Sequence, residues 1–217
     1  MNLQSPPIPA PDVDAFVAVV DDDKEIREST ARLLRSAGLQ PLLFSSVTEF
    51  AQASLPDGPT CLVLDIRMPG RSGLELQRDL AAAGVILPIV FMTGHGDIPM
   101  TVQAMKAGAI EFLTKPFRDQ DLLDAVHVGL ARDRERRASE QELVTIRARF
   151  EELTPRERAI LLDVVRGRLN KQIAADMGIT ETTVKVHRSN MMRKFGATSV
   201  PELCRMAGRL NLPPKKS

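Results

Sequence analysis

The sequence predicts an α/β doubly wound sheet of five parallel strands, followed by a small all-α domain. Short apolar runs alternate with helical stretches from residue 15 to about 132, which is typical of a parallel sheet covered by helices. Signals for helix starts and stops then recur at close spacing over residues 151–212. The chain has 217 residues, a length that accommodates two small domains.

The charge is distributed unevenly along the chain, although the formal net charge is only +1. The net charge is −7 over residues 1–131, +2 over residues 132–150 and +6 over residues 151–217. The basic part is therefore the candidate for contact with a polyanion. The two cysteines form neither a disulfide pattern nor a zinc-binding pattern. The sequence also shows no signal peptide and no apolar run long enough to span a membrane, so we expect a cytoplasmic protein without membrane contact.

Each expected strand of the first domain is a short, mainly apolar segment of four to six residues, and most helices end at a glycine. Helix starts are marked by side chains that cap free backbone amides. The expected elements are, in order, strand 16–20, a helix from Asp22 or Asp23 to Gly38, strand 39–44, a short helix capped by Ser45 or Ser46, strand 61–64 ending on Asp65, helix 73–83, strand 89–92 ending on Thr93, helix 98–107, strand 110–113 and a helix starting near Arg118.

A charged segment separates the two domains. Charges of both signs, without Pro or Gly, predict a solvated helix that continues the preceding one. Leu143, Ile146, Phe150 and Leu153 then recur at steps of three and four, as in a coiled-coil seam or in an apron packed on the next domain, and the pattern leaves both open. We assign residues 1–14 to a disordered tail, 15–132 to the first domain, 133–150 to a charged helical linker, 151–212 to the second domain and 213–217 to a loose tail.

The second domain has the signals of four helices. Thr154 as N-cap, Pro155 at the first helical position and Glu157 in a capping box start the first helix. A tight helix–glycine–helix step follows at Gly178, and in a basic unit this step is typical of a helix-turn-helix. The first helix is expected to stop at Gly167, the next two to cover 171–177 and 181–195, and the last to start at Ser199 and Pro201.

Polar side chains end the strands of the first domain. Because the carboxyl ends of parallel strands share one edge, Asp21, Asp22, Asp65, Thr93 and Lys115 should converge in one crevice. Carboxylates there repel each other, and Mg²⁺ removes the repulsion with one or two carboxylates and a phosphate oxygen as ligands. Asp22 and Asp65 could bind it directly and Asp21 through water. Asp65 is a candidate covalent acceptor of a phosphoryl group, whose oxygens Lys115 and Thr93 would hold.

The third helix of the second domain has two distinct faces on a helical wheel. Val184, His187, Met191 and Phe195 should face the core. The opposite face carries short polar and cationic side chains, which suit the major groove of DNA. Together with two residues that open the preceding helix, the predicted DNA-binding residues are Asn170, Lys171, Thr182, Lys185, Val186, Arg188, Ser189 and Arg193.

Four segments of the first domain resemble the receiver domain of two-component response regulators: VVDDD at 19–23, LDIRMPG at 64–70, MTGH at 92–95 and LTKPF at 113–117. The resemblance implies a sheet of order 2-1-3-4-5, as in flavodoxin and CheY, and a cis bond between Lys115 and Pro116. It implies that a sensor histidine kinase phosphorylates Asp65. It also implies that Asp21, Asp22, Asp65 and the backbone carbonyl of Arg67 hold Mg²⁺, that Thr93 and Lys115 hold the phosphoryl oxygens, and that Phe112 is the switch aromatic.

Three segments of the second domain resemble the LuxR-type helix-turn-helix: LTPRE at 153–157, NKQIA at 170–174 and TTVKVH at 182–187. The whole chain is thus similar to the NarL/FixJ group of response regulators, and its receiver looks closest to the FixJ branch. The resemblance implies double-stranded promoter DNA and RNA polymerase as partners and a homodimer when phosphorylated. It makes Leu203, Met206 and Leu210 of the last helix candidate dimer residues.

Two other functions can be weighed from the residues alone. A Mg²⁺-dependent phosphatase of the haloacid dehalogenase type needs a second aspartate two residues after its nucleophile, where this chain has Arg67. A DNA binder with a phosphorylation-independent receiver would not need the complete set of pocket residues. The sequence therefore favours a regulator, and not an enzyme, that responds to phosphorylation.

Overall fold

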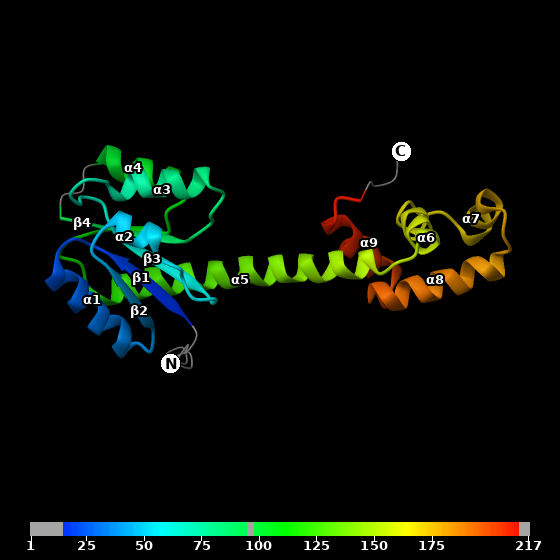
Figure 1. The fold of residues 1–217 in the computed structure, drawn as a ribbon, viewed down its shortest axis with the longest axis horizontal. Helices are drawn as coiled ribbons and strands as arrows, with labels where there is room; N and C mark the ends of the chain where they lie inside the picture. Colours follow the sequence, from blue (N-terminus) through cyan, green and yellow to red (C-terminus); the bar gives the residue numbers. More distant parts are fainter. Residues whose placement is uncertain (1–14, 95–97, 213–217) are drawn as a thin grey trace, which may run out of the picture. The chain divides into compact units, whose positions relative to one another are not determined.

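The computed structural model describes residues 15–94 and 98–212 (Figure 1). The chain divides into two compact units, Met1–Arg137 and Ala138–Ser217. The predicted disorder of residues 1–14 and the predicted loose tail 213–217 concern residues outside the described part. Within that part, no helix combines the length and the apolar character needed to cross a bilayer.

The N-terminal unit contains a five-stranded parallel sheet in the order β2-β1-β3-β4-β5, which confirms the predicted fold class. Strands β2 and β5 begin one residue later than predicted and β3 one residue earlier. The strands are β1 (Phe16–Val20), β2 (Gln40–Phe44), β3 (Thr60–Asp65), β4 (Ile89–Thr93) and β5 (Glu111–Thr114).

Helices cover both faces of this sheet (Figure 1). Alternate residues of each strand enter one of two apolar cores, because successive side chains of a strand point to opposite faces. Side-chain caps start three of the helices, at Asp23, Ser46 and Ser72. Helices α1 (Lys24–Ser36) and α5 (Asp119–Glu151) lie on one face, and α2 (Val47–Gln52), α3 (Gly73–Ala82) and α4 (Ile98–Lys106) on the other.

Helix α5 approaches the start of β3 very closely. A Cβ atom on Gly129 would lie 2.6 Å from Sγ of Cys61, so only glycine fits here without a shift. One turn later, the buried Asp133 accepts a hydrogen bond of 3.0 Å from the backbone N–H of Thr60. Burial acts to raise the pKa of Asp133, but hydrogen bonds from Arg137, Thr60 and Arg136 together hold it below its ordinary value. These contacts fix α5 to the central strand.

The C-terminal unit is a small helical bundle that begins earlier than residue 151. Ile146 of α5 is 2% exposed in its core, and Phe150 and Leu153 pack in the same core. Arg209 donates hydrogen bonds to the carboxylate of Glu142 and to the carbonyl of Ser139. The apolar stripe around Ile146 therefore packs on the core of the C-terminal unit. The remaining helices are α6 (Pro155–Val165), α7 (Asn170–Met177), α8 (Glu181–Phe195) and α9 (Val200–Arg209).

The close approach of α5 predicts that Gly129→Ala destabilises the protein by about 1–3 kcal/mol, because the added methyl group overpacks a filled core. Because the obstructing atom is Sγ of Cys61, the loss should shrink in a Cys61→Ala background. Urea denaturation followed by circular dichroism measures both effects.

The matched control is Gly208→Ala in α9, where none of the described atoms lies within 4 Å of an added Cβ. Alanine favours a helix over glycine, so this variant should be stabilised by up to about 1 kcal/mol. An equal loss of stability for Gly129→Ala with and without Cys61 would show that the two residues do not obstruct each other.

Candidate functional site

The predicted acidic residues meet at the carboxyl edge of the sheet. Asp21 and Asp22 follow β1, and Asp65 is the last residue of the neighbouring strand β3. A carboxylate oxygen from each of the three lies within 4.8 Å of the other two. Asp21 and Asp65 are buried, whereas Asp22 is exposed. The sheet therefore confines three negative charges to one small crevice that is open on one side.

Backbone and side-chain hydrogen bonds fix the loop after β1. The backbone N–H of Asp23 donates to Oδ1 of Asp21 over 2.9 Å. Arg27, one turn into α1, donates to the backbone carbonyl of Asp21 over 2.6 Å. Arg27 is not among the predicted site residues, and its signal in the sequence is its position six residues after Asp21, in the first turn of a helix. Arg27 holds the chain so that the carboxylate of Asp21 points into the crevice.

Lys115 is the cation that faces these acids. Its Nζ lies 2.5 Å from Oδ2 of Asp21 and 3.5 Å from Oδ1 of Asp65. Oδ1 of Asp65 is buried and accepts no hydrogen bond from the described residues. Burial raises the pKa of Asp65 above its ordinary value, Lys115 opposes this, and Asp21 adds to it. One ammonium group thus leaves the three carboxylates incompletely neutralised, and the donor set suits a hard divalent cation.

Strands β4 and β5 bring further predicted residues to this edge. Thr93, the fully buried last residue of β4, is aligned with Thr114 of β5. Its backbone carbonyl accepts a hydrogen bond of 2.7 Å from the backbone N–H of Lys115. The bond between Lys115 and Pro116 is cis, as predicted. Phe112 is partly buried against the core under α4, and the side chain of Arg67 is exposed in the loop after β3.

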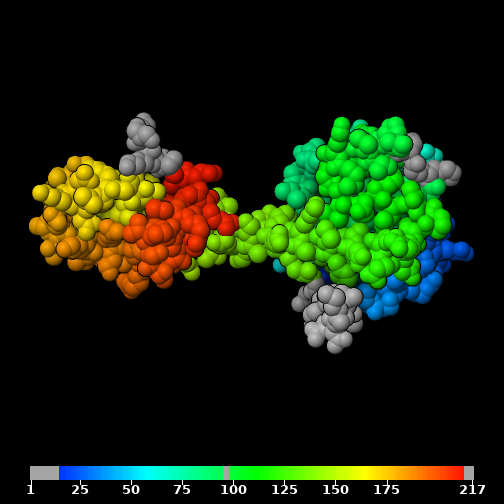
Figure 2. Space-filling model, turned by 180° about the vertical axis from the view of Figure 1, so that it is seen from behind, coloured from blue at the N-terminus to red at the C-terminus, as the bar shows by residue number. Residues whose placement is uncertain are grey.

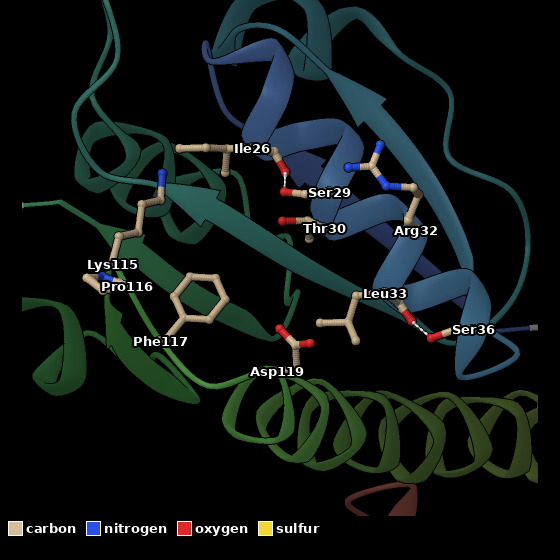
Figure 3. Close-up of a pocket in the computed structure, with 10 residues that line it drawn as sticks. All are labelled: Ile26, Ser29, Thr30, Arg32, Leu33, Ser36, Lys115, Pro116, Phe117 and Asp119. Carbon is tan, nitrogen blue, oxygen red and sulfur yellow. Dashed lines mark hydrogen bonds between the residues drawn. The ribbon is translucent and has the colours of Figure 1, made fainter.

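A surface hollow opens beside Lys115, between α1 and the start of α5 (Figure 3). Lys115, Pro116 and Phe117 line one side, and residues of α1, among them Ile26 and Leu33, line the opposite side (Figure 3). The hollow combines apolar side chains with the cationic edge of the acidic crevice.

Helix α8 presents the predicted polar face to solvent. Val184, Met191 and Phe195 are buried as predicted, whereas His187 is only partly buried. On the other side the apolar side chain of Val186 has an exposed fraction of 56%. The other exposed side chains on that face are Thr182, Lys185, Ser189 and Arg193.

Two predicted DNA-binding residues contact each other where α7 meets α8. Nη1 of Arg188 donates a hydrogen bond of 2.9 Å to Oδ1 of Asn170, while Lys171 is exposed. A second contact fixes the other end of α8, where Lys194 lies 2.8 Å from the buried carboxylate of Glu157. The hydrogen bond from Lys194 lowers the pKa of Glu157. Lys194 is thus engaged inside the unit, and the exposed face of α8 is held in a defined orientation.

The burial of α9 argues against two of its three predicted dimer residues, whereas Leu210 stays partly exposed. Leu203 has an exposed fraction of 0% and Met206 of 7%, and both belong to the core of the C-terminal unit. Leu210 packs partly against the same core. A side chain buried within one chain cannot contact a second copy, so Leu203 and Met206 stabilise the unit itself.

Comparison with known proteins agrees with this organisation. Residues 17–127 match the family described as response regulator receiver domain, and residues 151–207 match the bacterial regulatory proteins of the luxR family. The first match contains the acidic crevice, and the second contains α8.

Relatives match over nearly the whole chain. Nodulation protein W of Bradyrhizobium diazoefficiens is 49% identical over 198 residues, which are 91% of this chain and 87% of the relative. Transcriptional regulatory protein FixJ of Azorhizobium caulinodans is 46% identical over 88% of this chain and 90% of its own. The solved structure of response regulator StyR is 49% identical, with a TM-score of 0.81 over 90% of this chain and 99% of its own. The chain therefore belongs to the FixJ-like response regulators, which join a receiver domain to a LuxR-type DNA-binding domain.

Proposed function

We propose that this protein is a transcription regulator that is activated when a sensor histidine kinase transfers a phosphoryl group to Asp65. The observation that carries the proposal is the environment of Asp65. Its buried Oδ1 lies beside Lys115 and near two further carboxylates, in the same chain as a basic helix-turn-helix unit. A phosphoryl acceptor and a DNA-binding surface in the same chain are the two parts that a phosphorylation-dependent transcription regulator needs.

The carboxylates fit a magnesium ion. Asp22 and Asp65 would bind it directly, Asp21 through water, and the backbone carbonyl of Arg67 would be a further ligand. Bound there, the ion would neutralise negative charge on the phosphoryl oxygens during transfer.

The residues of the chain itself account for the transfer step. A carboxylate oxygen of Asp65 attacks the phosphorus of the phosphohistidine; the new O–P bond forms while the P–N bond breaks, and the leaving nitrogen keeps its electron pair. Lys115 and Thr93 hold the transferred oxygens, which requires Lys115 to exchange its 2.5 Å contact with Asp21 for the phosphoryl group. The hollow beside Lys115 lets the kinase approach from the side of α1.

The apolar surface of α4 supports dimerisation as the consequence of phosphorylation. Ile98, Val102 and Met105 are 80%, 44% and 39% exposed, at the spacing of one helix face. Figure 2 shows α4, β5 and the first turns of α5 as one continuous green surface of the N-terminal unit. Inward movement of Thr93, followed by Phe112, would change this surface and favour a second copy on it.

DNA recognition then follows from the exposed face of α8. A dimer brings two such helices to successive turns of the major groove, so inverted-repeat promoter sites are expected. In this proposal Lys185 and Val186 contact base edges, and Arg188, Asn170 and Lys171 contact phosphates. The exposure of Lys185, Val186 and Lys171 supports it. At the promoter, in the cytoplasm, the regulator would act on RNA polymerase.

The test of the acceptor is Asp65→Asn. Incubation with acetyl phosphate and Mg²⁺ should label the wild type and leave the variant unlabelled, because an amide oxygen cannot form the acyl phosphate. In gel-shift titrations, promoter affinity should rise with labelling in the wild type only. Labelling of Asp65→Asn would disprove the acceptor, and wild-type affinity independent of labelling would favour a receiver that acts only as a scaffold.

The α4 surface predicts that Val102→Glu keeps the labelled protein monomeric, because a charge in an apolar interface is costly to bury. Val85→Glu is the matched control, since Val85 is exposed to a similar degree, 48% against 44%, in the loop before β4. Light scattering of labelled protein after size-exclusion chromatography should show dimers for the wild type and the control. If labelled Val102→Glu also formed dimers, Val102 of α4 would not be part of the dimer interface.

The face of α8 predicts that Val186→Ala weakens promoter binding about tenfold, because two methyl groups lose their contact with a thymine methyl group. The dependence of affinity on salt should stay the same, because no charge is lost. Val144→Ala, which removes an equally exposed valine of the same unit, serves as control and should bind like the wild type. Equal affinities for all three proteins would exclude Val186 from the DNA interface.

A further inference from the structure

Helix α3 begins directly on the peptide that carries the candidate acceptor. The backbone N–H of Gly73, the first residue of α3, donates a hydrogen bond of 3.0 Å to the carbonyl of Ile66. A Cβ atom at Gly73 would come closer than 3.0 Å to the carbonyl oxygen of Asp65 and within 3.3 Å of its carbonyl carbon. Real Cβ atoms essentially never approach another atom that closely. The obstructing atoms belong to the backbone, so no side-chain rotation can relieve the contact.

The first turns of α3 are held by a capping box and by a buried leucine. The backbone N–H of Glu75 donates to Oγ of Ser72, while Oε2 of Glu75 accepts from the backbone N–H of Ser72. This capping box fixes the first turn of the helix. Leu76, 3% exposed, anchors the next turn in the core, and Cγ of Leu64 would lie 3.0 Å from the added Cβ. The added Cβ atom therefore presses on the peptide of Asp65, and relieving the contact displaces the start of α3 and the end of β3 relative to each other.

We infer that Gly73 is a positioning residue for phosphoryl transfer, an inference that rests on the proposed role of Asp65. Because Gly73 has no side chain, α3 can lie directly on the peptide of Asp65. The hydrogen bond from Gly73 to Ile66 then closes the loop from Ile66 to Ser72, which contains Arg67. This packing sets where the carboxylate of Asp65 stands relative to Asp21 and Asp22. Gly73 touches neither the phosphoryl group nor a metal ion, and it acts through the backbone of Asp65.

The experiment compares Gly73→Ala with Ser72→Ala in the full-length protein. Ser72→Ala removes the side-chain cap from the same helix start but places no atom against Asp65, so it reports the effect of a weakened α3 alone. Three quantities are measured for each protein: the Tm without metal, the Kd for Mg²⁺ from the Mg²⁺-dependent rise in Tm, and the initial rate of labelling by acetyl phosphate.

Gly73→Ala should raise the Kd for Mg²⁺ about tenfold, as changes in residues that support metal ligands do. The labelling rate should fall about 100-fold, because a shift on the order of 1 Å at reacting groups has that effect. Ser72→Ala should lower the Tm while the Kd and the rate stay at their wild-type values. Values for Gly73→Ala equal to those of Ser72→Ala would overturn the inference and assign Gly73 a role in stability alone.

Two further outcomes are separable. If the wild type takes no label, the proposed function fails, whereas the Mg²⁺ titration still decides the role of Gly73 in placing Asp65. If Gly73→Ala does not fold in buffer, sucrose is added, because it favours the folded state. The Mg²⁺ titration is repeated once the circular dichroism spectrum of the variant matches that of the wild type. A wild-type Kd under those conditions would again overturn the inference.

Discussion

Electrostatic repulsion among Asp21, Asp22 and Asp65 is the constraint around which the N-terminal unit is organised. Three carboxylates whose oxygens lie within 4.8 Å of one another would move apart in a flexible chain. Here Asp21 and Asp22 directly follow β1, and Asp65 ends the neighbouring strand β3, in a parallel sheet with apolar cores on both faces. The free energy gained by burying those cores holds the acids together. Lys115 offsets part of the charge and leaves the crevice receptive to a cation or a phosphoryl group.

The central strand β3 carries the proposed acceptor, Asp65, and is held at both ends by glycines of the helices that cross it. At its start, Gly129 of α5 packs on Cys61, and Asp133 binds the backbone of Thr60. At its carboxyl end, Gly73 of α3 packs on Asp65. The two helices lie on opposite faces of the sheet. A strand fixed from both faces at both ends gives Asp65 a defined position, which a transfer reaction between two proteins requires.

In the C-terminal unit, several cations are engaged in ion pairs, whereas the proposed DNA-binding face of α8 exposes others to solvent. Lys194 neutralises the buried Glu157, and Arg168 contacts both Asp163 and Asp176. Such engaged cations orient α8 and stabilise the bundle. The exposed Lys185 remains on the outer face, together with short polar side chains and Val186. Both units thus use ion pairs to position the residues of their candidate sites.

The sequence by itself determined the succession of strands and helices along the chain and the convergence of Asp21, Asp65 and Lys115, because periodicity and strand ends are local properties of the chain. Only the tertiary structure decided which neighbour each apolar face meets. The apolar face of α9 could equally have been a dimer surface or a core, and Leu203 belongs to the core. The same holds for the stripe around Ile146, which packs on the C-terminal unit. Contacts such as that of Gly73 with Asp65 join residues on different elements, and no spacing along the chain encodes the distance between them.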